Sequence, residues 1–158
     1  HSGSYLWGGD RAGARYYSVM DTIGSADNYK SGRWDPNSGQ SQMNSYQANL
    51  FVQYHGLELF GIYETMKGVN RGADQNFTQT AVQLKYNVGP FYLATRYNNV
   101  DDNMGSTVTR MNFGGGWNML ESVVIKLDYV TQSYDGVAHG IYDGGKFHGL
   151  VMEAAISF

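Results

Sequence analysis

The sequence contains no cysteine, which excludes a disulfide scaffold and thiol chemistry but leaves the compartment open. It also lacks any uninterrupted run of about 18 apolar residues, so a transmembrane helix is excluded. Basic residues are not in excess, because 11 Lys and Arg stand against 14 Asp and Glu. The resulting net charge of −3 gives no basic surface for nucleic acid. No secretory leader is recognisable, which leaves a mature chain, a processed fragment or a cytosolic protein as alternatives.

Glycine and aromatic residues are abundant, with 21 Gly, 13 Tyr and an aromatic content of 15%. This composition suits β-strands, tight turns and rings at a membrane interface. The mean hydropathy of −0.42 is too polar for a helical membrane protein. A transmembrane β-barrel keeps such a polar average, because only alternate residues of each strand meet lipid. With 158 residues the chain has the material of one domain.

The last twelve residues alternate strictly between two faces. Leu150, Met152, Ala154 and Ile156 share one parity, and the final Phe158 continues it. Successive side chains of a β-strand point to opposite faces, so this segment predicts a strand with one apolar face. The other face is smaller and carries Glu153. An aromatic residue ends the pattern, where a soluble chain usually has a frayed polar tail.

The same alternation recurs upstream and predicts an antiparallel, up-and-down, all-β chain. In residues 57–66 we place Leu59 and Tyr63 outward, because Glu58 and Glu64 share the opposite parity. The pattern does not fix the facing of residues 14–23. The eight expected strands are residues 14–23, 46–54, 57–66, 78–88, 91–97, 107–119, 122–132 and 147–158.

Short and long connections alternate between these strands. The short ones are residues 55–58, 87–90 and 118–121, and the long ones are residues 25–44, 67–75, 98–106 and 134–146. Transmembrane barrels have short periplasmic turns and longer surface loops. Aromatic residues form two expected bands: Tyr54, Phe91 and Trp117 beside the short turns, and Tyr63, Phe77, Tyr97 and Tyr129 toward the long loops. These features favour a transmembrane β-barrel over a soluble barrel with inward apolar faces.

The number of strands bears on function. Eight strands make the smallest transmembrane barrel, whose lumen is filled by side chains. A strand-like stub at Tyr5 to Trp7 would be a ninth, and bacterial single-chain barrels have even numbers of strands. The sequence therefore favours residues 1–158 as a single barrel domain that is the C-terminal portion of a larger barrel. A complete eight-stranded barrel is the alternative.

Eight charged side chains share the hydrated parity and are the candidate lumen-facing, pore-lining residues. They are Glu58, Glu64, Lys85, Arg96, Arg110, Lys126, Asp128 and Glu153. Four of each sign predict a mixed wall with at most weak ion selectivity. An unpaired buried charge costs several kcal/mol, so we expect local pairing among Arg110, Lys126 and Asp128 rather than a dedicated substrate site. Glu153 is expected near Lys126 across the last hairpin.

The long segment of residues 25–44 carries Lys30, Arg33 and Trp34, which make it a candidate constriction loop. A solvated surface loop is the more common outcome for such a segment. The four His residues lack metal-ligand spacing and have no Cys partner. No Ser lies in a nucleophile elbow. We therefore expect no enzymatic activity, no metal and no cofactor.

Several motifs resemble porin-like Gram-negative outer-membrane proteins related to the phosphate-selective porins. They are residues 56–61 (GLELFG), 126–134 (KLDYVTQSY), 143–149 (DGGKFHG) and 153–158 (EAAISF). The terminal Phe158 resembles the assembly signal of such barrels. The resemblance implies a wide barrel in the bacterial outer membrane, often trimeric, that conducts small solutes. Phosphate selectivity is not implied, because the sequence lacks that family's dense series of Arg and Lys.

Three functional classes follow from these patterns. The first is a porin-like channel for passive or weakly selective passage of small solutes. The second is a small structural or adhesive outer-membrane barrel whose surface loops bind a partner, and the third is a soluble β-barrel binder. For a membrane barrel the expected partners are outer-membrane lipid and lipopolysaccharide, the barrel assembly machinery, and further copies of the chain or other outer-membrane proteins. Nucleic acid is not among them.

Overall fold

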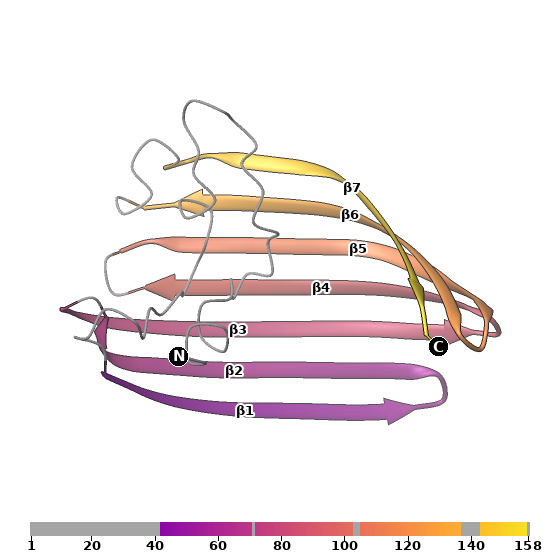
Figure 1. Ribbon diagram of the computed structural model, residues 1–158, viewed down its shortest axis with the longest axis horizontal. Coiled ribbons are helices and arrows are strands. Elements are labelled where there is room, and N and C mark those ends of the chain that lie inside the picture. Colours follow the sequence, from indigo (N-terminus) through magenta and orange to yellow (C-terminus); the bar gives the residue numbers. More distant parts are fainter. Residues whose placement is uncertain (1–41, 71, 103–104, 137–142, 158) are drawn as a thin grey trace.

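Seven β-strands form one antiparallel sheet in the computed structural model, which describes residues 42–70, 72–102, 105–136 and 143–157. The strands are paired in chain order, each with the next (Figure 1). Their bounds are β1 Gln42–Tyr54, β2 Leu57–Asn70, β3 Ala73–Val88, β4 Phe91–Asp102, β5 Thr107–Leu120, β6 Val123–Asp135 and β7 Lys146–Ile156. Among these residues there is no helix with the length and hydropathy that a membrane crossing needs. The predicted all-β, up-and-down antiparallel architecture is confirmed.

The register separates polar from apolar side chains. Leu59 lies opposite Val52 on β1 and Leu84 on β3, whereas Glu58 lies opposite Lys85. Directly opposed residues of an antiparallel pair share a face, so Leu59 and Glu58 lie on opposite faces, as predicted. A slip by one residue would exchange the two faces of a strand, and the contrast between them therefore fixes the register.

Tight turns join the strands at one end of the sheet. His55 and Gly56 connect β1 to β2 with φ angles of 45° and 84°, and Gly89, with a φ of 58°, precedes Pro90 between β3 and β4. Positive φ at the centre of a two-residue hairpin matches the right-handed twist of the flanking strands. Glu121 and Ser122 connect β5 to β6. The predicted short connections are thus confirmed, although β5 extends to Leu120.

The predicted loop of residues 67–75 is wrong. β2 continues to Asn70 and β3 begins at Ala73, which leaves two residues between them. Strict alternation of short and long links therefore does not hold. The other long links are shorter than expected, since residues 103–106 join β4 to β5 and residues 136–145 join β6 to β7. These strand ends have only isolated apolar residues, such as Val69 and Val100, so their apolar alternation is too sparse to detect them.

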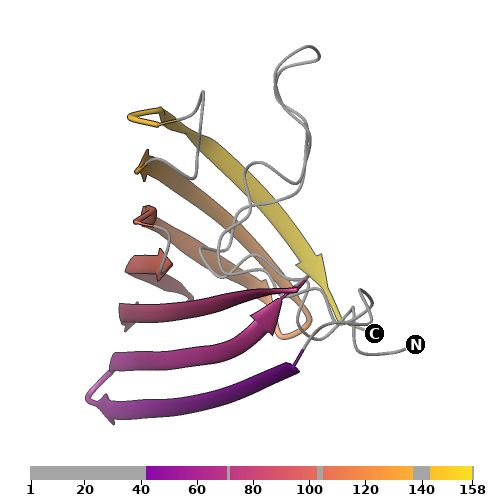
Figure 2. The same ribbon diagram turned by 90° about the vertical axis from the view of Figure 1, so that its left-hand side faces the viewer.

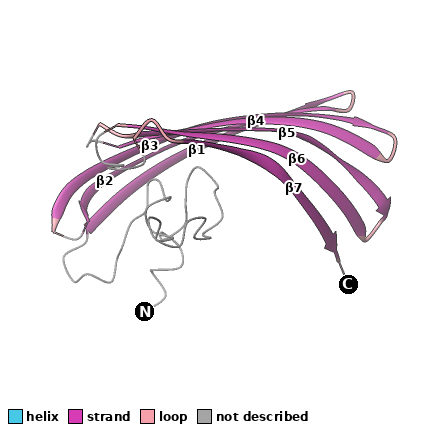
Figure 3. Cartoon of the chain, turned by 90° about the horizontal axis from the view of Figure 1, so that it is seen from above, coloured by secondary structure: helices cyan, strands magenta, loops and turns pink. Residues whose placement is uncertain are grey.

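The sheet is curved like a trough, as Figures 2 and 3 show. Within the described residues it is not closed, and β1 and β7 are its two edges. The described residues therefore form an open all-β sheet, and its closure into a barrel is not seen. The expected strand of residues 14–23 and the stub from Tyr5 to Trp7 lie outside the described residues.

Two small buried clusters lie on the polar face of the sheet, near the links between β2 and β3 and between β4 and β5. Met66 packs with Phe77 and the partly buried Met43, and Val100 packs with Val108 and Tyr134. Phe77 lies opposite Met66 and is only 7% exposed. Its assignment to an outward aromatic band is therefore wrong. The period-two pattern already placed Phe77 on the parity of Gln79, so its place on this face follows from strand geometry.

Candidate functional site

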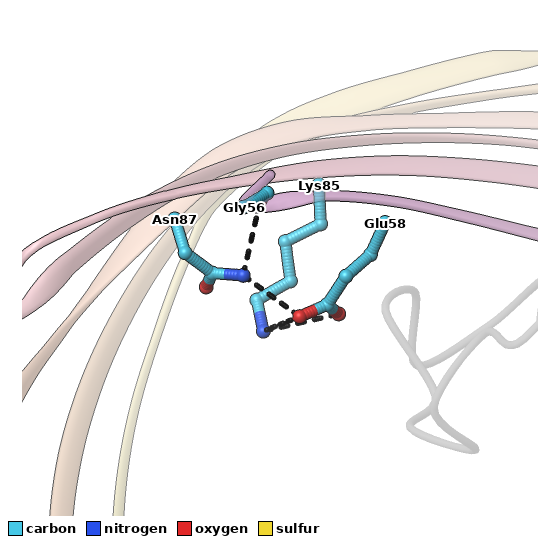
Figure 4. Close-up of polar contacts among 4 residues, drawn as sticks. All are labelled: Gly56, Glu58, Lys85 and Asn87. Carbon is cyan, nitrogen blue, oxygen red and sulfur yellow. Dashed lines mark hydrogen bonds and ion pairs between the residues drawn. The ribbon is translucent and has the colours of Figure 1, made fainter. Parts of the chain in front are cut away.

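The eight predicted lumen residues all lie on the concave face of the sheet. Glu58 faces Lys85 across β2 and β3, and Lys126 faces Glu153 across β6 and β7. The register links Arg96 to Gln83 and Asn112, and it continues through Arg110 and Asp128 on the same face. Figure 4 shows the Glu58 and Lys85 side chains pointing to the concave side. Of the charged residues that β2 to β7 place on this face, the sequence singled out all but Asp102, which ends β4 opposite Phe77.

Glu58 is the centre of a polar cluster beside the turn between β1 and β2 (Figure 4). The ammonium group of Lys85 lies 3.3 and 3.4 Å from the two carboxylate oxygens of Glu58. The amide of Asn87 donates hydrogen bonds to Glu58 Oε1 at 2.7 Å and to the carbonyl of Gly56 at 3.2 Å. Two donors from β3 thus hold one carboxylate, which ties the turn to the third strand.

Lys126 and Glu153 form a second ion pair on the concave face, 3.6 Å apart. Their side chains are 36% and 44% exposed, so water screens the pair and its net contribution to stability is small. The predicted proximity of these two residues is confirmed. The predicted pairing of Lys126 with Asp128 is wrong. A directly opposed residue on the neighbouring strand is closer than a residue two places along the same strand, so Lys126 pairs with Glu153.

The two arginines on this face bind amide side chains. Arg96 donates to Gln83 Oε1 at 3.3 Å. Arg110 donates to Gln132 Oε1 at 3.0 Å and to Asn112 Oδ1 at 3.2 Å. An amide oxygen satisfies a guanidinium donor without neutralising its charge. The charge pattern of the sequence does not predict these amide partners, although their parity on neighbouring strands is a signal that could identify them.

A hollow of about 470 Å³ opens in the concave face between β3 and β6. Two of its lining side chains, Tyr92 and Asp128, lie against Gly116 and Gly114 of β5. A Cβ on Gly116 would overlap the ring of Tyr92, and a Cβ on Gly114 would overlap the carboxylate of Asp128. Because these two positions are glycine, the ring of Tyr92 and the carboxylate of Asp128 can pack against β5. Lys85, Arg96, Lys126 and Asp128 are among the residues around the hollow.

The convex face is apolar and exposed. Leu93, Phe113 and Met152 have exposed fractions of 60%, 62% and 75%. In the seven described strands, the charged residues on this face are confined to strand ends away from the tight turns, namely Lys67, Asp74, Asp101, Asp135 and Lys146. The rings of Phe91 and Trp117 stack beside the tight turns with centroids 6.1 Å apart. A belt of apolar side chains thus crosses all seven strands.

The candidate constriction residues Lys30, Arg33 and Trp34, and the terminal Phe158, lie outside the described residues. No group of three or more His, Cys, Asp or Glu side chains that could hold a metal ion is found in the part of the chain that the structure describes. Comparison of the chain with protein-family models, curated proteins and solved structures finds no significant match. The functional argument therefore rests on the geometry of the two faces.

Proposed function

We propose that this chain is part of a β-barrel of the bacterial outer membrane that serves as a porin-like channel for small solutes. The observation that carries this proposal is that the sheet bends around its charged face (Figures 3 and 4). Further strands that continued this curvature would enclose the charged residues and leave the apolar belt outside. That arrangement is the one a lipid-embedded barrel with a hydrated lumen requires.

The dimensions of the apolar belt support a membrane location. On β5 the convex face has only apolar residues over nine positions, from Met111 to Met119. A strand of this length spans roughly 27 Å, or about 20 Å when tilted as barrel strands are, and a barrel's apolar band is about 25 Å tall. Exposed aliphatic side chains on every strand would be an aggregation hazard in water.

The curvature disfavours a soluble barrel. Such a fold buries its apolar side chains inside the barrel, on the concave face of the sheet. Here Leu50, Leu93 and Met152 point to the convex side, whereas Arg96 and Lys85 point to the concave side. A soluble assembly would have to cover the whole convex belt with another protein layer.

The charge balance of the concave face supports weak selectivity. It carries five acidic and four basic residues in the described strands, and two opposite pairs neutralise each other at 3.3 and 3.6 Å. A wall of this kind hydrates ions of both signs without a strong field of one sign. We therefore propose passage of small solutes rather than selection of one ion.

Conductance across a planar bilayer tests the channel. The full chain is purified in detergent and added to one side of the bilayer, with a heat-denatured sample as the control. We expect steady conductance steps with less than a several-fold preference for cations or anions. Stable insertion without conductance would favour the structural or adhesive barrel. Recovery of folded monomer in buffer without detergent would overturn the membrane location altogether.

A further inference from the structure

The hollow in the concave face is lined by charged side chains that are paired and by charged side chains that are not. At one side Lys85 is paired with Glu58, and at the other Lys126 is paired with Glu153. Between them Arg96 has Gln83 as its one side-chain partner among the described residues. Asp128 has no side-chain partner in the same part of the chain. Two opposite charges thus remain available to a solute.

Arg96 and Asp128 stand on opposite sides of the hollow. Arg96 lies opposite Asn112 on β5, and Asp128 lies opposite Gly114, two residues further along the same strand. From strand spacing and rise, these two backbone positions are roughly 12 Å apart. Their side chains do not pair, because Arg96 donates to Gln83 on the far side. The separation leaves room for a ligand that carries both charges.

Both groups are partly shielded from water. Each has intermediate exposure, and the Asp128 carboxylate lies over Gly114, where no side chain competes for the space. Charge-assisted hydrogen bonds are stronger in such surroundings than on an open surface. A guanidinium binds a carboxylate through two parallel hydrogen bonds, and a carboxylate binds an ammonium group.

We propose that this hollow is a binding subsite for short zwitterionic peptides, with the peptide carboxylate at Arg96 and its ammonium group at Asp128. A short peptide suits this separation, since an extended chain covers about 3.3 to 3.6 Å per residue and three residues come close to the roughly 12 Å between the two backbone positions. The proposal deepens the channel function and rests on it, because it places a solute subsite in the lumen wall. Lys85 and Lys126 do not compete for the peptide carboxylate, since Glu58 and Glu153 neutralise them.

Equilibrium binding to the full chain in detergent tests the subsite, with triglycine as the probe and isothermal titration calorimetry as the measurement. We expect millimolar binding of triglycine. N-acetyltriglycine lacks the ammonium group and triglycinamide lacks the carboxylate, so each should bind at least about 10-fold more weakly. Equal binding of all three peptides, or binding of none, would overturn the proposal.

Charge reversal identifies the residues. Arg96→Glu and Asp128→Arg should each weaken triglycine binding by at least about 10-fold. The double variant should regain most of the affinity, because triglycine can then bind in the opposite orientation. Arg110→Gln is the control, because Arg110 is on the same face but outside the hollow, and we expect a change below 3-fold, that is, less than about 0.7 kcal/mol. Circular dichroism shows whether each variant folds. If the single variants bind triglycine like the unaltered chain, the assignment fails.

The binding experiment and the conductance experiment test the subsite and the channel independently. Calorimetry in detergent needs no open channel, so absence of conductance steps would contradict the channel while leaving the binding result valid. Conversely, a conducting chain that binds triglycine no better than the two capped peptides would keep the channel and lose the subsite. In a conducting bilayer, triglycine should also shorten the open periods more than either capped peptide does.

Discussion

Lys126 on β6 lies directly opposite Glu153 on β7, and the two charges are 3.6 Å apart on the concave face. Glu58 and Lys85 stand in the same relationship at the other side of the sheet, at 3.3 Å. The second pair differs in its surroundings, because Asn87 also donates to Glu58 and both charged side chains are less exposed. The two pairs therefore make a natural comparison of the same chemistry at different degrees of shielding.

Removal of the carboxylate should cost more at Glu58 than at Glu153. Glu153→Gln breaks a screened pair and should reduce the free energy of unfolding by less than about 1 kcal/mol. Glu58→Gln weakens hydrogen bonds from Lys85 and Asn87, and a loss of about 1 to 3 kcal/mol is expected. Urea unfolding of the chain folded into lipid vesicles measures both. A greater loss for Glu153→Gln would contradict this ranking.

Gly116 is required by the ring of Tyr92, which fills the space of the missing side chain. Gly116→Ala should destabilise the sheet by about 1 to 3 kcal/mol, because overpacking forces the ring or the strand to move. Gly149→Ala on β7 is the matched control, since nothing lies within 4 Å of its Cβ position. Tyr92→Ala should remove most of the penalty. Additive effects of the Gly116 and Tyr92 substitutions in unfolding titrations would show that the ring is not the cause.

The stacked pair of Phe91 and Trp117 should couple across β4 and β5. Their rings are 6.1 Å apart with an interplanar angle of 23°. A double-mutant cycle with Phe91→Ala and Trp117→Ala should give a coupling energy of about 0.5 to 1.5 kcal/mol. Thr95 and Phe113 are also directly opposed on the convex face and provide a control pair with one ring. A larger coupling at the control pair would rule out stacking as the source.

The alternation of polar and apolar residues at period two was the most informative feature of the sequence for predicting this fold. Because side chains alternate at period two, the places of Glu58, Lys126 and Glu153 on one face followed from their spacing alone. Strand ends were harder to predict. Residues 67–70 and 73–75 have only Val69 and Ala73 as apolar side chains, so no alternation distinguishes a strand from a loop there, and the true link has two residues. Phe77 was misplaced because its ring was given more weight than its parity.

The partners of the charged residues could be predicted only where two opposite charges face each other directly. Lys126 and Glu153 met that condition. Arg96 did not, because its partner is the neutral Gln83, and any of several amides on this face had the same parity. The hollow also could not be predicted from the sequence. It depends on how Tyr92 and Asp128 lie over Gly116 and Gly114, which requires the register of three strands at once.

Met152 and Val151 are adjacent on β7 but face opposite sides of the sheet, with exposed fractions of 75% and 40%. If the convex face meets lipid, Met152→Arg should destabilise the vesicle-folded protein by about 2 to 4 kcal/mol, which is the cost of a cation near the bilayer midplane. Val151→Arg adds the same charge one residue away, opposite Asp128, and should change this free energy by less than about 1 kcal/mol, because it enters the polar wall and gains a cross-strand partner. Urea titrations of vesicle-folded protein give both values. In detergent micelles, which deform around a charge, the difference between the two variants should shrink. Equal costs for the two substitutions in vesicles would mean that lipid does not distinguish the faces, and the membrane proposal would then fail.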